Sequence, residues 1–318
     1  MKRILAALAA LAIAAAWSPA SAETVLRVGD QKGGSRALME AAGVLSDLPF
    51  RLEWSEFPAA APLLEALNAG AIDTGIAGDA PFTFAAAAGA PIKAIFAIRQ
   101  DQGGLALLVK PDSPVKEFAD LRGKRIATGR GSIGHQLLLA ALEEAKLKTD
   151  DVKLTFLLPA DARVALVTGA IDAWSTWEPY TSQLETSGAG RVIKNGRGIT
   201  PGLSFQPTRI DAIQTKRPAL EEFVRRLAKA RVWGTAHPEA FAASWSKLMS
   251  LPEEVPLSWF KRANIQPAPI DEGVVADLQR AIDLYHRNGL IPRRVDASAL
   301  FDTSFNAAAA AGAAEASR

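Results

Sequence analysis

The tetrapeptide Gly-Ala-Ile-Asp occurs at residues 70–73 and again at 169–172, 99 positions later. In both places it follows a strand with alternating apolar residues and then a helix, and its glycine ends that helix. The strands are expected at 50–56 and 153–158. A repeated strand and helix of this kind predicts a mostly parallel sheet with helices on its faces. We therefore expect two homologous α/β lobes, each with a doubly wound sheet.

Four loops follow the expected carboxyl ends of strands, where ligands of open parallel sheets gather. They are residues 30–34, 77–81, 129–134 and 174–180. The two copies of the repeat continue differently, because the first leads into Gly78-Asp79 and the second into a stretch with Trp174 and Trp177. We expect the ligand site among these loops.

The turn at 129–134 connects a strand at 125–128 to an amphipathic helix that is expected to leave it at His135. The first N–H groups of such a helix have no partner within the helix, so they can bind an anion. The turn also matches G-x-G-x-x-G, which alone would indicate either a dinucleotide site or a plain connection between strand and helix. An equivalent loop in the other half of an exported chain favours a small anion, held between Gly78-Asp79 and residues 131–134.

The N-terminus has basic Lys2 and Arg3, an apolar run at 4–17 and small residues up to Ala22. This pattern predicts a cleavable signal peptide at 1–22 and therefore export. No later segment is long and apolar enough to be expected to span a bilayer. The sequence has no cysteine, which excludes disulfides, thiolate metal sites and a lipid-modified cysteine anchor. We expect a free protein of the periplasm.

About 296 residues remain after the signal peptide, more than one hydrophobic core usually supports. We expect lobe 1 at 23–106 and 205–306 and lobe 2 at 107–204, with the chain crossing between them at 105–109 and 204–205. The alanine-rich residues 307–318 have no wide apolar face and are expected to form a disordered tail.

Charge and histidine usage exclude some classes of function. The chain has 36 Lys and Arg against 34 Asp and Glu, and no basic block, so no nucleic acid partner is expected. The three histidines, His135, His237 and His286, are widely separated, so no metal site is expected. A nicotinamide cofactor is not expected outside the cytoplasm, so no cofactor is expected either. The chain is expected to be a monomer.

Several motifs together resemble the aliphatic sulfonate-binding proteins of ABC importers, part of a wider group with taurine-, nitrate- and thiamine-precursor-binding proteins. The motifs are Gln31-Lys32-Gly33, Gly78-Asp79, Gly131-Ser132 with His135, residues 159–163, and Trp174 with residues 177–180. The resemblance covers nearly the whole chain after the signal peptide. It implies a type II periplasmic binding protein, in which two α/β lobes joined by a two-strand hinge close on a small anionic ligand.

The resemblance and the glycine turn together suggest which residues lie at the ligand. They are Gln31, Gly78, Asp79, Ser132, Ile133, Gly134, His135 and Trp177. The chain has Ala77 where relatives commonly carry a hydroxyl residue, and Ile133 and Gly134 where they carry small or hydroxyl residues. Fewer side-chain hydroxyls are therefore expected around the ligand.

A sulfonate is a monoanion at any physiological pH, so its site needs hydrogen-bond donors rather than a base. The backbone N–H groups of 132–134 and the Ser132 hydroxyl are expected to supply them. Asp79 is expected either to cap the helix that follows it, or to repel dianions or receive an amine of the ligand. His135 is expected to be a neutral donor at the pocket edge, and a structural histidine is the alternative.

The tryptophans divide into two groups. Trp174 and Trp177 are three residues apart, so at most one is expected to line the cleft, and we assign Trp177 to it and Trp174 to the interior of lobe 2. Trp233, Trp245 and Trp259 lie in C-terminal helices with apolar neighbours, and core packing is expected for them.

We expect a periplasmic receptor that captures an aliphatic sulfonate and delivers it to an inner-membrane ABC permease. The alternatives are a receptor for nitrate or a thiamine pyrimidine precursor, an enzyme on the same fold, and a sensory module that lost its solute. A hydrolase using Ser132 is disfavoured, since His135 in the first turn of the same helix is poorly placed as its base.

Overall fold

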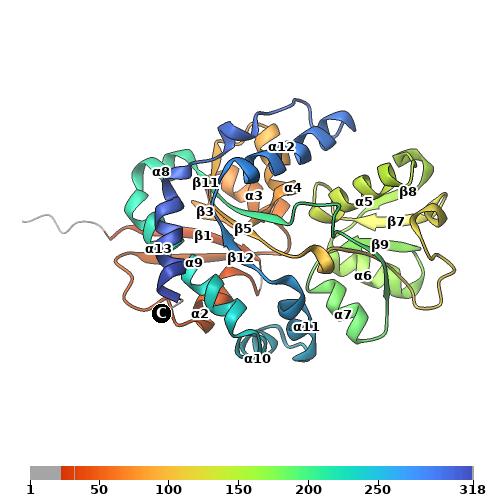
Figure 1. Cartoon of the computed structure of the whole chain (residues 1–318), viewed down its shortest axis with the longest axis horizontal. Helices are drawn as coiled ribbons and strands as arrows, with labels where there is room; N and C mark the ends of the chain where they lie inside the picture. Colours follow the sequence, from red (N-terminus) through yellow and green to blue (C-terminus); the bar gives the residue numbers. More distant parts are fainter. Residues whose placement is uncertain (1–22, 32, 317–318) are drawn as a thin grey trace, which may run out of the picture.

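The computed structural model describes residues 23–31 and 33–316, and the predicted signal peptide at 1–22 lies outside the described residues. Figure 1 shows two α/β lobes side by side along the long axis of the molecule. Each lobe is built on one sheet, sheet A in lobe 1 and sheet B in lobe 2. The predicted division into two α/β lobes is confirmed by this architecture.

Sheet A has seven strands in the order β12-β5-β11-β3-β1-β2, with β4 beside β11. They are β1 (Val25–Gln31), β2 (Arg51–Phe57), β3 (Thr74–Gly75), β4 (Ala77–Gly78), β5 (Ile92–Arg99), β11 (Leu203–Arg209) and β12 (Gln266–Ala268). Strand β1 is parallel to β2 and β3, whereas β11 is antiparallel to β3, β4 and β5. The sheet is therefore mixed, and the expectation of a mostly parallel sheet is wrong for lobe 1, because β11 returns from lobe 2 and pairs antiparallel with β3, β4 and β5. The parallel part is the repeat predicted from the sequence.

Helices cover both faces of sheet A, and the longest, α9, packs with α2 and α13 over one of them (Figure 1). The helices of lobe 1 are α2 (Ser35–Ala41), α3 (Ala60–Asn68), α4 (Asp79–Ala87), α8 (Ile210–Thr215), α9 (Arg217–Ala236), α10 (Pro238–Met249), α11 (Glu254–Ala263), α12 (Glu272–Arg287) and α13 (Asn306–Ala316), with short 3-10 turns η4 (Ala297–Leu300) and η5 (Thr303–Phe305).

Sheet B has five strands in the order β10-β6-β9-β7-β8. They are β6 (Ala106–Val109), β7 (Arg125–Thr128), β8 (Lys153–Phe156), β9 (Ala173–Thr176) and β10 (Arg191–Asn195). The helices of lobe 2 are α5 (Ile133–Glu144), α6 (Pro159–Thr168) and α7 (Tyr180–Thr186), with 3-10 turns η2 (Phe118–Leu121) and η3 (Thr149–Asp151). Strand β7 is parallel to β8 and β9, as β1 is to β2 and β3.

The repeated tetrapeptide has the same structural task in both lobes. In lobe 1, Asp73 forms an ion pair of 2.6 Å with Arg27 of β1, which also donates to the carbonyl oxygen of Gly70 at 2.8 Å. In lobe 2, Asp172 pairs with Arg125 of β7 at 2.7 Å, and Arg125 donates to the carbonyl oxygen of Gly169 at 2.8 Å. One arginine thus fastens the end of a helix to the neighbouring strand, which explains why glycine and aspartate recur together.

The expected crossings between the lobes are wrong by a few residues. Residues 105–109 contain β6, and Ala106 pairs with Thr176 inside sheet B. Leu203 and Ser204, expected in lobe 2, pair with Arg99 and Ile98 of β5 inside sheet A. The backbone of a buried apolar run needs hydrogen-bond partners, and a sheet ladder supplies them. The chain therefore crosses at 100–105, which includes η1 (Gln102–Gly104), and at 196–202.

The disordered tail expected at 307–318 is also wrong for its described residues. Residues 306–316 form α13, which packs along α9 through the buried residues Ala309 and Gly312 (Figure 1). A Cβ atom at Gly312 would overlap the carbonyl oxygen of Arg225 on α9. The helix docks through the close approach that small residues permit, so it needs no wide apolar face.

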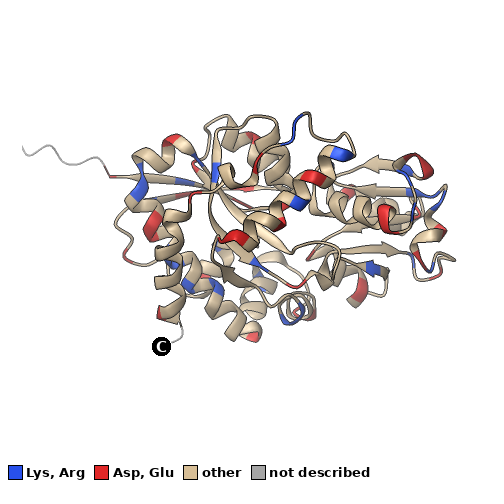
Figure 2. Cartoon of the chain, turned by 45° about the horizontal axis from the view of Figure 1, so that its top comes forward, with Lys and Arg blue, Asp and Glu red and all other residues tan. Residues whose placement is uncertain are grey.

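Among residues 23–31 and 33–316, no helix is long and apolar enough to cross a membrane. Figure 2 shows basic and acidic residues interspersed along the ribbon of both lobes.

Candidate functional site

A cavity of about 920 Å³ lies between the two lobes. All four predicted loops line it: Gln31, Gly33 and Gly34 after β1; Gly78 and Pro81 after β4; residues 129–133 after β7; and residues 177–180 after β9. The ends of β2 and β8 add residues 57–62 and 156–161, and α9, α10 and α11 close the remaining side. The carboxyl ends of the parallel strands of both sheets thus meet at one cleft.

The structure separates the eight predicted site residues into two groups. Gln31, Gly78, Ser132, Ile133 and Trp177 line the cavity. Asp79, Gly134 and His135 do not line it and are buried behind it. Lys32 lies outside the described residues.

Ser132 holds the glycine turn in shape. It is the N-cap of α5, which begins two residues earlier than expected, and its Oγ accepts from the N–H of His135 at 3.2 Å. The same hydroxyl donates its one proton to the carbonyl oxygen of Gly129 at 2.7 Å. Within the described residues no acceptor takes the N–H of Ile133, as expected for the first turn of a helix. The free donor of this turn is therefore a backbone amide rather than the Ser132 hydroxyl.

His135 lies beneath the turn and is only 1% exposed. Its Nδ1 accepts from the N–H of Gly131 at 3.3 Å, and its ring packs edge-on against Phe156. Burial, with a smaller effect of Arg130, lowers the pKa of His135 to about 4, so the ring is neutral at pH 7. The imidazole supports the backbone of the turn and does not face the cavity.

Gly134 has a packing role. A Cβ atom there would lie 2.6 Å from the carbonyl oxygen of Ser175 on β9 and 2.8 Å from Oγ1 of Thr128. The Ser175 hydroxyl also donates to the carbonyl oxygen of Gly134 at 2.7 Å. Glycine at this position therefore lets α5 approach the sheet closely.

Asp79 joins the two lobes. It is the first residue of α4 and not its N-cap, because Gly78 takes that position with an extended backbone. Its carboxylate is 2% exposed and accepts from the N–H of Ala80 at 2.8 Å and from Nε2 of Gln136, on α5 of lobe 2, at 3.1 Å. Burial raises the pKa of Asp79 to about 6.

This raised pKa predicts a pH dependence of stability. Because the folded protein favours protonated Asp79, the contribution of this group to stability is full below pH 4 and is lost as the pH rises toward 6. The loss amounts to about 2 to 3 kcal/mol. Urea denaturation at pH 4 and at pH 7 measures the effect. Between these two pH values, the free energy of unfolding should fall by about 2 to 3 kcal/mol less in Asp79→Asn than in the wild type. Asp30 and His135 also titrate in this range, but they do so in both proteins, so their effects cancel when the two proteins are compared. An equal fall in the free energy of unfolding in both proteins would contradict the prediction.

Arg231 is a cavity residue that the sequence reasoning missed. Its side chain comes from α9, is 9% exposed, and donates through Nη2 to the Ser35 hydroxyl at 3.0 Å, whereas its Nε has no partner among the described residues. Burial lowers the pKa of Arg231 to about 10, and the nearby carboxylate of Asp30 opposes this, so the guanidinium is charged at pH 7. The sequence feature that could have identified Arg231 is its position on the apolar face of a helix, between Leu227 and Gly234.

The structure confirms the prediction for Trp174 and corrects it for two of the C-terminal tryptophans. Trp174 is 1% exposed and packed in lobe 2, as predicted. Trp245 and Trp259 pack in lobe 1, but they also line the cavity, so core packing alone was the wrong interpretation for them. Trp233 does not line the cavity and stacks on the ring of His237.

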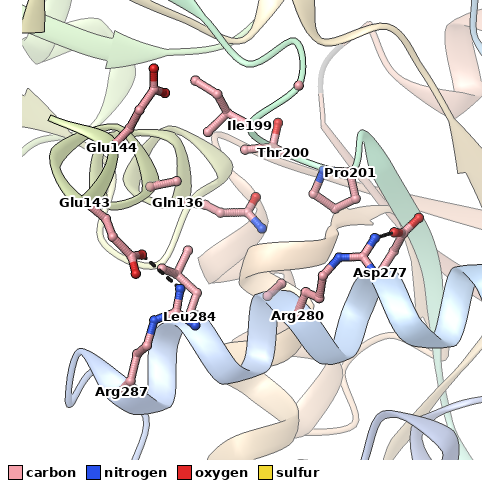
Figure 3. A pocket seen from close by; sticks show the side chains of 13 residues that line it. Gln136, Glu143, Glu144, Ile199, Thr200, Pro201, Asp277, Arg280, Leu284 and Arg287 are labelled. Carbon is pink, nitrogen blue, oxygen red and sulfur yellow. Dashed lines mark hydrogen bonds and ion pairs between the residues drawn. The ribbon is translucent and has the colours of Figure 1, made fainter.

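A second cavity, of about 480 Å³, lies on the hinge side between α5, α12 and the crossing at 196–202 (Figure 3). Glu143 of α5 points toward Arg287 of α12, and the two form an ion pair of 2.9 Å between the lobes. Arg280 pairs with Asp277, and Glu144 pairs with Lys194. The charged side chains that line this cavity are therefore paired within the described part of the chain.

Comparison with known proteins shows the family of this chain. The profile of the family described as "NMT1/THI5 like" matches residues 56–241, more than half of the chain. The chain belongs to the NMT1/THI5-like family. A relative from Escherichia coli (strain K12), which carries the name of an aliphatic sulfonates-binding protein, is 34% identical over 296 residues, or 92% of each chain.

Two solved structures show the same fold as this NMT1/THI5-like protein. The alkanesulfonate-binding protein SsuA from Xanthomonas axonopodis pv. citri, bound to MOPS, has a TM-score of 0.80 and 32% identity, and the match covers 89% of this chain and 99% of that one. The periplasmic aliphatic sulphonate binding protein SsuA from Escherichia coli also has a TM-score of 0.80, with 34% identity over 88% and 92% of the two chains.

Proposed function

We propose that this protein is a periplasmic receptor that captures an aliphatic sulfonate in the cleft between its lobes and delivers it to an inner-membrane ABC permease. The observation that carries the proposal is Arg231, a cation that lines the cavity and whose guanidinium donates one hydrogen bond, to the Ser35 hydroxyl, within the described residues. A guanidinium has five N–H donors, so a largely buried one with a single protein partner points to acceptors supplied by a ligand. The names of the relatives and the predicted signal peptide support the class of ligand and the compartment.

A sulfonate suits this donor set. Its three oxygens share one negative charge, and an arginine fork binds two such oxygens with charge-assisted hydrogen bonds. The amide of Ile133, at the positive end of the twelve-residue helix α5, offers a further donor from the other lobe. The proposed ligand contacts are therefore Arg231, the backbone of Ile133, and Gln31, which also lines the cavity.

Donors from both lobes connect binding to closure. Gly78 and Ile133 already touch across the cleft, since a Cβ atom at Gly78 would lie 2.6 Å from Cγ2 of Ile133. Moving an open-to-closed ratio from 99:1 to 1:99 requires about 5.5 kcal/mol of differential binding. A ligand that contacts Arg231 in lobe 1 and Ile133 in lobe 2 can supply this difference, whereas a ligand held by one lobe cannot.

The enzyme alternative is weaker than the binding role. In a Ser-His pair the imidazole accepts the proton of the hydroxyl. Here the Ser132 hydroxyl donates to Gly129, and Nδ1 of His135 is occupied by the N–H of Gly131. These two residues are therefore proposed to shape the loop rather than to act as nucleophile and base.

The test is thermal denaturation of protein stripped of ligand by unfolding and refolding. Butanesulfonate at 100 times its dissociation constant should stabilise the folded state by about 2.7 kcal/mol and raise Tm by roughly 5 to 10 °C. Nitrate and a thiamine pyrimidine precursor are the comparison ligands, and a larger shift with either one would replace the sulfonate assignment. The receptor role fails if no anion of this panel raises Tm.

A further inference from the structure

Partly exposed aromatic rings line the cavity from both lobes. Phe57 and Trp259 belong to lobe 1, and Trp177 and Tyr180 belong to lobe 2. Phe156 also lines the cavity, but the guanidinium of Arg130 lies 3.9 Å from the centroid of its ring. Large aromatic side chains are usually covered by protein, and a group of open rings around a cavity marks a place where an apolar ligand completes the packing.

The indoles on the two sides are held in place before any ligand arrives. Trp245 donates through Nε1 to the carbonyl oxygen of Gly33 at 2.6 Å, and Trp259 packs edge-on against it with ring centroids 5.7 Å apart. In lobe 2, Trp177 packs edge-on against Tyr180 at 6.1 Å. Rings that are already oriented lose little conformational freedom when a flat group binds beside them.

The carboxylates of the cavity are poorly placed to receive a charged amine. Asp101 pairs with Arg197 at 2.7 Å, and Glu178 pairs with Arg262 at 2.7 Å. Asp161 also lines the cavity but is exposed. A zwitterion such as taurine would bring an ammonium group to a region that offers rings, so an uncharged tail fits better.

We infer that the cleft selects sulfonates with a planar aromatic tail over sulfonates with a saturated tail of the same size. This inference rests on the proposed role as a sulfonate receptor, and it assigns an aromatic tail to the preferred ligand in place of the aliphatic one. The volume of about 920 Å³ is ample for an aryl group beside the headgroup. A saturated ring buries slightly more apolar surface than an aromatic one, so the hydrophobic effect alone favours the saturated tail. A preference for the aromatic tail would therefore be evidence of contact between the ring of the ligand and the aromatic rings of the cavity.

The experiment is isothermal titration calorimetry of ligand-stripped protein with benzenesulfonate and cyclohexanesulfonate, which share the headgroup and the six-membered ring. Benzenesulfonate should bind roughly three- to tenfold more tightly. Trp259→Leu should bring the ratio of the two affinities to about one and leave the affinity for methanesulfonate unchanged. Trp233→Leu, which alters a tryptophan outside the cavity, should keep the wild-type ratio.

The outcomes separate this inference from the function on which it rests. Equal binding of the two ring sulfonates, or tighter binding of cyclohexanesulfonate, overturns aromatic selection and leaves the receptor role standing. An unchanged ratio in folded Trp259→Leu also overturns it. If that variant does not fold, Trp177→Leu makes the same test from the opposite lobe. Absence of binding by all three sulfonates overturns the proposed function itself.

Discussion

Replacing Arg231 by methionine is expected to lower the affinity for sulfonates by roughly 100-fold or more and to leave the fold intact. A hydrogen bond to a charged group contributes about 1.5 to 3 kcal/mol, so losing a two-oxygen contact costs about 3 to 6 kcal/mol. The methionine side chain fills most of the same buried space, and Asp30 keeps its hydrogen bonds from the backbone N–H groups of Gln31 and Arg36 after it loses the nearby positive charge. Binding should therefore respond far more strongly than stability.

Calorimetric titration with butanesulfonate and thermal denaturation of the same samples measure the two effects. Arg231→Lys keeps the charge but not the fork, so its affinity should lie between those of the wild type and Arg231→Met. Arg163→Met is the matched control, because Arg163 lines the same cavity but is exposed at its rim. A folded Arg231→Met protein with wild-type affinity would remove Arg231 from the site.

Replacing Arg262 by methionine is expected to destabilise the protein by about 3 to 5 kcal/mol, the usual cost of leaving one partner of a buried ion pair uncompensated. Arg262 of α11 pairs with Glu178 of lobe 2 at 2.7 Å, and the Glu178 side chain is only 7% exposed. Burial already raises the pKa of Glu178, and Arg262 opposes that shift. Without the guanidinium, the carboxylate keeps only its hydrogen bonds from the backbone and hydroxyl of Ser182.

Urea denaturation at pH 7 measures this loss. The double variant Arg262→Met, Glu178→Gln removes the orphaned charge along with its partner and should recover much of the stability, which a double-mutant cycle expresses as a coupling energy. Arg287→Met is the comparison on the hinge side, where the pair with Glu143 is exposed on both partners and should matter little. Equal losses for Arg262→Met and Arg287→Met would contradict the assignment of the first pair as buried.

Local sequence patterns were sufficient for the repeated core of the fold. Strands with alternating residues, helices that end at glycine, and the tetrapeptide at 70–73 and 169–172 predict the parallel units, because each of these features acts within one strand and its neighbouring helix. Arg27 and Arg125 show the physical reason for the repetition, since each binds the aspartate and the glycine carbonyl of its own copy. The loops at the cavity follow from the same units.

The remainder of the site depends on contacts between distant parts of the chain. Arg231 and Trp245 reach the cavity from helices that follow the second crossing, and only the packing of α9 and α10 against the loop after β1 brings them there. The sequence predicts a helix cap or a ligand contact for Asp79, whereas its side-chain partner is Gln136 on the other lobe. Periodicity within a segment carries no information about such pairs. It likewise gives no sign of a helix that docks through Gly312.

The position of β11 in sheet A determines which lobe of this protein can finish folding first. Strand β11 lies between β5 and β3, and it is reached only after the whole of lobe 2 has been made. A nascent chain that ends near residue 200 therefore holds β5 apart from β1, β2 and β3, and its first sheet is in two pieces. Closing such a long loop is slow. During synthesis, lobe 2 has every strand of its sheet before lobe 1 does, so lobe 1 remains incompletely folded until β11 has been made.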